Sequence, residues 1–110
     1  MSAAVNFGRK YVRMRDLAEE RADIYRIFSN DKRILIFWLI SEEERSVNDI
    51  AETIGTSIQN TSQHLRLMKD KGIVESRRNG KEIYYHVANN ELGNYCRQIN
   101  SPGHGLKSLR

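Results

Sequence analysis

The chain has very little cysteine and no long apolar run, and both absences narrow its class. Its single cysteine, Cys96, cannot close a disulfide within the chain, which fits a reducing, cytoplasmic setting. The longest uninterrupted apolar run covers residues 34–40, seven residues, whereas a membrane-spanning helix needs about 20. The first ten residues lack the hydrophobic segment of a signal peptide. These observations predict a cytoplasmic protein that makes no contact with a membrane.

Residues suited to catalysis are also scarce. The three histidines are scattered along the chain, and no pair of carboxylates occupies a plausible cleft. Ser62 and His64 are two positions apart in a predicted helix, so their side chains do not face each other. We therefore expect that the protein is not an enzyme, and no motif indicates a cofactor.

The basic charge of the chain is unevenly distributed. The formal net charge is +4 and the isoelectric point is about 9.4. Residues 31–55 carry three basic and six acidic side chains, net −3, whereas residues 56–89 carry six basic and three acidic ones, net +3. This polarity permits a nucleic-acid partner. The length of 110 residues predicts one small domain, residues 1–100, with a modest core and a tendency to dimerise, followed by a flexible basic tail, residues 101–110.

Amphipathic helices are predicted at both ends of the domain, over residues 6–28 and 90–100. The apolar stripe of the first is wider than one small core needs, so part of it is expected to face a second subunit. Gly93 is expected to weaken the last helix. The stripe residues are Phe7, Tyr11, Met14, Leu17, Ala18, Ile24, Tyr25, Ile27 and Phe28 in the first helix, and Leu92, Tyr95, Cys96 and Ile99 in the last.

Three further helices are predicted between these ends, over residues 31–43, 47–54 and 56–71. The first contains the run ILIFWLI and is expected to be central, because it is hydrophobic on nearly all sides. The second and third are separated by a short turn containing Gly55. A short helix, a turn with glycine and a longer helix predict a helix-turn-helix.

Helix caps support these boundaries. Ser46 with Asp49 resembles a capping box before residues 47–54. For the next helix, Thr56 paired with Gln59 is the better capping box, and Ser57 paired with Asn60 is the weaker alternative.

A β-hairpin is predicted after Gly72. The dipeptide Asn79-Gly80 favours a two-residue type I′ turn, with Arg78 paired to Lys81. This register places Val74, Ile83, Tyr85 and Val87 on a buried face. The tip is basic, with Arg77, Arg78 and Lys81. The complete pattern is mainly α with a small β-hairpin, a winged helix-turn-helix of four helices, two strands and a last helix.

The helix over residues 56–71 has an unusual outward face. Thr61, Leu65 and Met68 are expected to point inward, which leaves uncharged amides and hydroxyls outside, where a soluble helix usually carries Lys and Glu. Such groups can form hydrogen bonds with base edges in the major groove of DNA. The major groove also presents the methyl group of thymine, which is apolar. The plain alternative is a solvated polar face, and His64 alone could instead serve helix packing. The predicted DNA contacts are Ser57, Gln59, Asn60, Ser62, Gln63, His64 and Arg66, with Ile58 at the edge of the face, and Arg77, Arg78 and Lys81 in the wing.

These motifs resemble the ArsR/SmtB family of winged-helix repressors over roughly residues 25–88. "DIAETIGTSIQNTSQHLRLMKDKGIVESRRNGKEIYYHV" is similar to the family pattern D-L-A-x-x-L-G-x-S-x-x-x-V-S-x-H-L-x-x-L-x-x-x-G-L-V, with Thr61 where valine is usual. The Arg77–Tyr85 segment matches the family's wing, R-R-x-G-[RK]-x-x-Y-Y. The resemblance implies a homodimer joined through its first and last helices, a palindromic operator in double-stranded DNA, and repression relieved by an effector.

The family's metal motifs are not reproduced. Its E-L-C-V-C-D-L segment corresponds to residues 44–50, where Ser46 and Asn48 stand at the two thiolate positions. The predicted last helix has no histidine and one acid, Glu91, so the second metal site of the family is missing too. A zinc site from His86, Cys96 and His104 has no recognisable spacing, and we predict no metal site.

Two questions stay open at this level. Cys96 fits a small buried side chain, but an inter-subunit disulfide across the last helices is the alternative. A winged helix can also serve as a protein-interaction module within a larger complex. Apolar side chains on the outward face would favour that reading, whereas Gln, Asn, Ser and Arg favour DNA.

Overall fold

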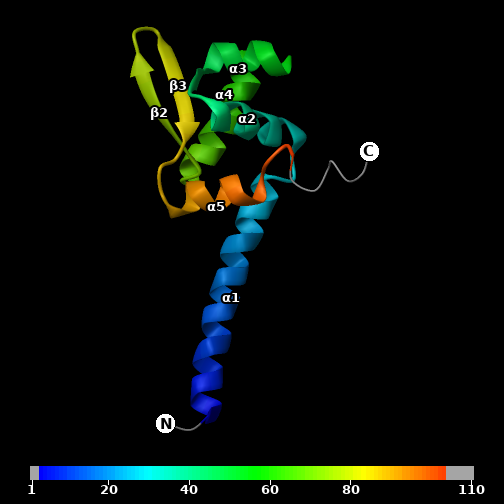
Figure 1. The fold of residues 1–110 in the computed structure, drawn as a ribbon, viewed down its shortest axis with the longest axis vertical. Helices are drawn as coiled ribbons and strands as arrows, with labels where there is room; N and C mark the ends of the chain where they lie inside the picture. The colour runs from blue at the N-terminus through cyan, green and yellow to red at the C-terminus, as the bar shows by residue number, and fades with distance from the viewer. Residues whose placement is uncertain (1–2, 104–110) are drawn as a thin grey trace. The chain divides into compact units, whose positions relative to one another are not determined.

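The computed structural model describes residues 3–103 and divides the chain into two compact units, residues 1–30 and residues 31–110 (Figure 1). The first unit contains one helix, and the second contains the remaining helices and the strands. Most of the predicted tail, residues 104–110, lies outside the described part of the chain.

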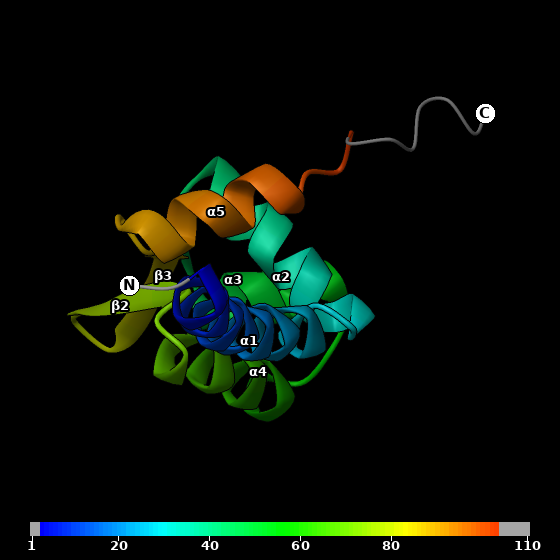
Figure 2. The same cartoon turned by 90° about the horizontal axis from the view of Figure 1, so that it is seen from below.

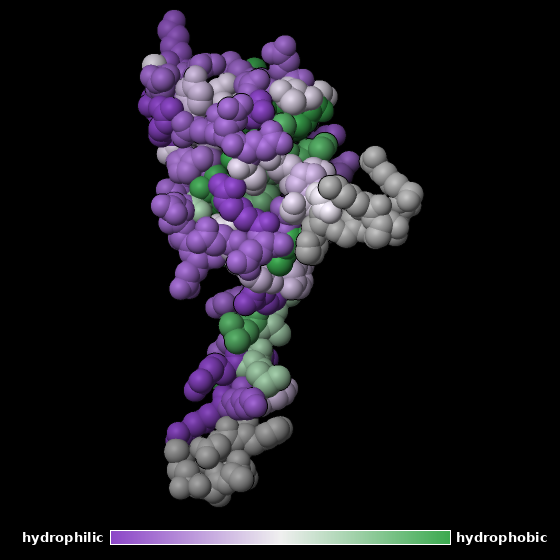
Figure 3. All heavy atoms as spheres, in the orientation of Figure 1, coloured by the Kyte–Doolittle hydropathy of each residue, from purple (hydrophilic) through white to green (hydrophobic). Residues whose placement is uncertain are grey.

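Helix α1 (Ala3–Ile27) begins three residues before its predicted start and has 25 residues. Figure 3 shows apolar patches on its surface between hydrophilic ones. Tyr11, Met14, Leu17 and Tyr25 are each about half exposed in the single chain. The side chain of Phe7, also assigned to the stripe, is outside the described set. The predicted stripe therefore presents apolar area that this chain alone leaves open to solvent.

In the second unit, helices α2 (Asp31–Glu42), α3 (Val47–Ile54) and α4 (Ile58–Asp70) form the predicted helix-turn-helix. The centre of the core is apolar and closed to solvent. Its fully buried side chains include Ile36, Phe37, Ile40, Ile50, Leu65 and Met68. Thr61 is buried among them, and its hydroxyl donates to the Ser57 carbonyl at 2.8 Å. A polar atom in the core is thereby satisfied, which allows threonine where the family usually has valine.

The caps decide where α3 and α4 begin. The Ser46 hydroxyl accepts from the Asp49 amide at 3.1 Å, as predicted. Gly55 adopts a left-handed conformation (φ 74°) and its amide donates to the Ala51 carbonyl, which ends α3. Ser57, the alternative weighted lower, is the cap of α4, since its hydroxyl accepts from the Asn60 amide at 3.0 Å. The predicted start at Thr56 was wrong by two residues.

The sheet has three antiparallel strands in the order β1-β3-β2. Strands β2 (Val74–Asn79) and β3 (Glu82–Val87) form the predicted hairpin, the wing. Strand β1 (Arg45–Ser46) pairs with β3 and was not predicted, because two residues carry no alternating pattern.

The predicted hairpin register was wrong. Arg78 pairs with Ile83, and the two-residue turn is Gly80-Lys81. Gly80 has φ +66° and no non-glycine residue in the described chain has positive φ, a pattern expected of a type II′ turn and not of type I′. The observed register differs from the predicted one by two residues. Because side chains alternate between the two faces of a strand, the same residues still share a face. Val74, Tyr85 and Val87 are buried as predicted, but Ile83, near the tip, is 40% exposed.

Helix α5 (Glu91–Ile99) is capped by Asn90, whose side chain accepts from the Gly93 amide at 2.7 Å. A Cβ added at Gly93 would lie 1.9 Å from the Ala88 carbonyl oxygen. The expectation that Gly93 merely weakens the helix is therefore incomplete, because this close approach requires glycine.

Cys96 is fully buried, and burial raises the pKa of its thiol to about 11. Figure 2 shows α5 and α4 on opposite sides of the second unit, with α2 and α3 between them.

No helix in the described part of the chain is both long and apolar enough to span a bilayer.

Candidate nucleic-acid interface

The outward face of α4 is polar and open to solvent. Gln59, Asn60, Gln63 and Arg66 are exposed, and Ser62 is half-buried at the margin. The opposite side of the helix carries Thr61, Leu65 and Met68, all fully buried. The predicted division between an inward and an outward face is confirmed. The packing of the inward side fixes the direction of the reading face, which we define as Gln59, Asn60, Ser62, Gln63 and Arg66.

Two of the contacts predicted at α4, Ser57 and His64, have structural partners within the protein. The Ser57 hydroxyl is engaged in the cap of α4. The Nδ1 of His64 lies 3.3 Å from a terminal nitrogen of Arg33 on α2. A guanidinium can only donate, so Nδ1 accepts and the ring proton belongs to Nε2.

Burial lowers the pKa of His64, and the neighbouring charges of Arg33 and Lys32 lower it further. His64 is therefore neutral at pH 7. Its bond to α2 supports the helix-packing role that the sequence left open beside direct contact with DNA.

The wing has one arginine held by the protein and two basic side chains at its tip. Arg77 donates from Nε to the Glu44 carboxylate at 2.8 Å, and its guanidinium lies 4.9 Å from the centre of the Tyr84 ring. The Arg77 guanidinium lowers the pKa of Glu44. Arg78 and Lys81 are exposed, and among the described residues neither has a side-chain hydrogen bond or ion pair. Of the three wing cations, Arg78 and Lys81 can therefore meet a phosphate without breaking an existing pair.

Glu44 is a component of this site that sequence reasoning missed. Besides Arg77, its carboxylate contacts Nδ1 of His86 at 3.2 Å, and Nε2 of His86 lies 3.7 Å from Glu75. These contacts join the segment before β1 to the base of the wing. The only sequence signal was an acid in the net-negative segment and an arginine in the net-positive one, which does not specify a pair.

The two positions that carry cysteine in the family's metal motif, Ser46 and Asn48, have other roles in this chain. The Ser46 hydroxyl is buried in the α3 cap, and the Asn48 side chain is exposed. Within residues 3–103 there is no group of three or more His, Cys, Asp or Glu side chains arranged to hold a metal ion. His104, which would complete a zinc set with His86 and Cys96, lies outside those residues.

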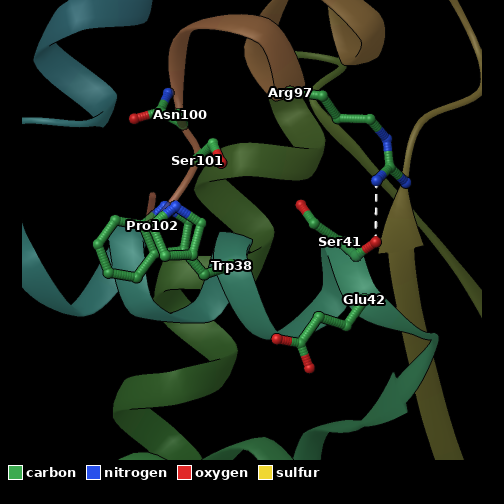
Figure 4. Close-up of a pocket in the computed structure, with 7 residues that line it drawn as sticks. All are labelled: Trp38, Ser41, Glu42, Arg97, Asn100, Ser101 and Pro102. Atoms are coloured by element: carbon green, nitrogen blue, oxygen red, sulfur yellow. Dashed lines mark hydrogen bonds between the residues drawn. The ribbon is translucent and has the colours of Figure 1, made fainter. Parts of the chain in front are cut away.

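A separate pocket of about 240 Å³ lies between α2 and the end of α5 (Figure 4). Arg97 crosses its margin and donates to the Ser41 carbonyl at 2.9 Å. Trp38 Nε1 and Asn100 Nδ2 lack hydrogen-bond partners in the described chain. Both atoms are closed to solvent, although their residues line the pocket.

Comparisons with known proteins agree with this geometry. Residues 17–77 match the helix-turn-helix domain family. Over 71 residues the chain is 37% identical to the cadmium resistance transcriptional regulatory protein CadC of Listeria innocua, covering 64% of this chain and 60% of CadC. The crystal structure of the transcriptional repressor BigR from Xylella fastidiosa is similar with a TM-score of 0.70 and 29% identity, covering 81% of this chain and 91% of that chain. The homodimeric winged helix-turn-helix DNA-binding domain of Mb0332 from Mycobacterium bovis gives a TM-score of 0.68 and 29% identity, covering 79% of this chain and 81% of that chain.

The fold, the polar face of α4 and the basic wing together define a winged helix-turn-helix DNA-binding protein. Within that class the chain belongs to the ArsR/SmtB-type transcriptional regulators, as the sequence motifs predicted. It spans 54% of the length of the mycobacterial regulator KmtR and 60% of that of CadC.

Proposed function

We propose that this chain acts as a homodimeric transcriptional repressor in the cytoplasm and that it binds a palindromic operator in double-stranded DNA. The reading face of α4 enters the major groove, while Arg78 and Lys81 contact the sugar-phosphate backbone or the adjacent minor groove. Two α4 helices about 34 Å apart then face successive major grooves on one side of the duplex.

The observation that carries this proposal is the chemistry of the reading face. Its amides and guanidinium are exposed, with the half-buried Ser62 at the margin, on a helix whose other side is locked into the core. Gln and Asn can bond both edge groups of adenine, and Arg can bond guanine. A protein-interaction module would be expected to expose apolar side chains at the centre of this face, which is polar here.

The homodimer is supported by the half-exposed apolar side chains of α1 and by the homodimeric state of the Mb0332 domain. Burial of this area in a second copy would supply apolar stabilisation that one small core lacks. Repression as the outcome is supported by the likeness to the repressor BigR. No effector is assigned.

The test is in vitro selection from a pool of randomised duplexes, followed by footprinting on the selected sequence. The expected result is one palindromic sequence protected on one face of the duplex, bound by a dimer. Equal affinity for all duplexes at physiological ionic strength would overturn the proposal.

A further inference from the structure

A shallow hollow of about 140 Å³ lies beside the reading face, between α4, the start of α3 and the wing. It shares Ser62 with the reading face, and Lys81 lies at its wing side. Its apolar lining includes Ile58, which is 53% exposed, and Ile83, which is 40% exposed. The complete lining is Val47, Asn48, Ile58, Ser62, Lys81, Glu82 and Ile83.

Ile58 is the first residue of α4 and directly follows its cap, Ser57. It precedes Gln59 and lies one helical turn before Ser62, so its side chain borders the reading face at its N-terminal end. Neither the cap nor the core needs an isoleucine at this place. The cap uses the Ser57 hydroxyl, and the buried side of the helix is formed by Thr61, Leu65 and Met68.

We propose that Ile58 is a specificity-determining residue that packs against the 5-methyl group of a thymine in each operator half-site. The proposal rests on the proposed function, because it assumes that α4 lies in the major groove. The thymine methyl is the apolar feature of that groove, and an exposed aliphatic side chain at the N-terminal part of the reading helix is its natural partner.

The surroundings of Ile58 favour thymine as the occupant. Gln59, adjacent in sequence, can bond adenine, so the neighbouring groups are suited to an A·T pair. Ile83 supplies a second apolar wall of the hollow, and Lys81 provides a charge for the phosphate on that side. The hollow is continuous with the reading face through Ser62, and two of its apolar lining residues, Ile58 and Ile83, are exposed in the single chain.

The test uses the duplex obtained by in vitro selection. Each thymine is replaced in turn by deoxyuridine, which removes the methyl group and leaves the pairing edges unchanged. At one position per half-site, replacement of a single thymine should weaken binding by the wild-type protein about fourfold, which corresponds to the loss of one buried methyl group. Replacement at that position in both half-sites should weaken binding more than tenfold. The Ile58→Ala variant should bind the thymine and uracil duplexes equally, and Ile58→Val should retain the preference.

Leu67→Ala is the matched control, because Leu67 is an exposed apolar residue of the same helix outside the hollow. It should keep the full preference for thymine. The thermal unfolding midpoint of Ile58→Ala should be close to that of the wild type. This measurement distinguishes the loss of a DNA contact from a loss of folding.

The outcomes separate this inference from the proposed function. A wild-type protein that selects a sequence but binds its thymine and uracil forms equally well overturns the role of Ile58 and leaves the proposed function standing. An Ile58→Ala protein that weakens both duplexes by the same factor also overturns it, because that is the result of a structural role. A wild-type protein that selects no sequence overturns the proposed function itself.

Discussion

The guanidinium of Arg77 lies against the carboxylate of Glu44, 33 positions earlier in the chain, with Nε 2.8 Å from Oε1. A terminal nitrogen of Arg77 is 2.5 Å from the same oxygen. One of the three wing cations is thus neutralised before DNA arrives, and the carboxylate joins the wing to the segment between α2 and β1. This pair distinguishes a cation that positions the wing from cations that are available to phosphate.

The substitution Glu44→Gln is expected to release Arg77 for DNA. Non-specific affinity at low salt should rise, and the slope of log K against log salt should become steeper by about 0.9, the effect of one additional phosphate contact. Fluorescence anisotropy with a random duplex over a range of salt concentrations measures both quantities. Glu43→Gln is the control. It removes a charge from the neighbouring residue, whose carboxylate lies 3.4 Å from Arg45 and not beside Arg77, so the slope should be unchanged. A slope that is the same in all three proteins would contradict the masking of Arg77.

Glu44 also predicts how stability responds to acid. Its pKa is lowered in the folded protein, so the unfolded chain binds a proton first as the pH falls. The stabilising contribution is present above the ordinary pKa of 4.5 and is lost as the pH drops through the lowered folded value. Urea unfolding at several pH values below 5 should show a smaller loss of unfolding free energy in Glu44→Gln than in the wild type. Parallel curves for the two proteins would count against this.

Arg78→Ala is expected to weaken binding evenly across DNA sequences and to reduce the salt slope by about 0.9, because Arg78 is assigned to phosphate. Arg97→Ala, which removes the same charge from α5, is the matched control and should leave the slope nearly unchanged. If Arg78→Ala changed the preferred sequence and kept the slope, the residue would be a base reader.

Gln59→Ala and Gln63→Ala should each weaken specific binding by about 1–3 kcal/mol for each lost base-pair contact, mainly at one operator position. The reason is that alanine cannot form hydrogen bonds with the edge of adenine, so the protein no longer distinguishes this base from others at that position. Titrations with single-base operator variants measure the loss position by position. Gln98→Ala on α5, also exposed, should have no effect. Unchanged footprints in both α4 variants would show that the reading face is wrongly assigned.

Gly93→Ala should destabilise the fold, because the new Cβ would lie 1.9 Å from the Ala88 carbonyl oxygen, which is a backbone atom. We expect a loss of about 1–3 kcal/mol or more in unfolding free energy, typical of overpacking. Gly8→Ala in α1 meets nothing within 4 Å and should be neutral or stabilising by about 1 kcal/mol, since alanine favours a helix interior. Chemical denaturation compares the two. A Gly93→Ala protein as stable as the wild type would mean that the loop before α5 moves freely.

The sequence by itself determined the helices, the helix-turn-helix, the presence of the wing and the division of α4 into a buried and an exposed face. Those features depend on spacings of two to four residues and on caps such as Ser46, which act between near neighbours in the chain. The same locality explains the limits. The cap of α4 had two candidates in adjacent residues, and a shift of the hairpin register by two residues keeps the same side chains on one face.

Only the tertiary structure decided which side chains meet across the fold. It paired Arg77 with Glu44 and His64 with Arg33, brought Ala88 against Gly93 and set Ile83 outside the core. The long-range pairs join residues more than 30 positions apart, and their geometry depends on how whole helices and strands pack. No local spacing encodes that arrangement, so the roles of Glu44 and Ile58 became visible only once α3, α4 and the wing were in place.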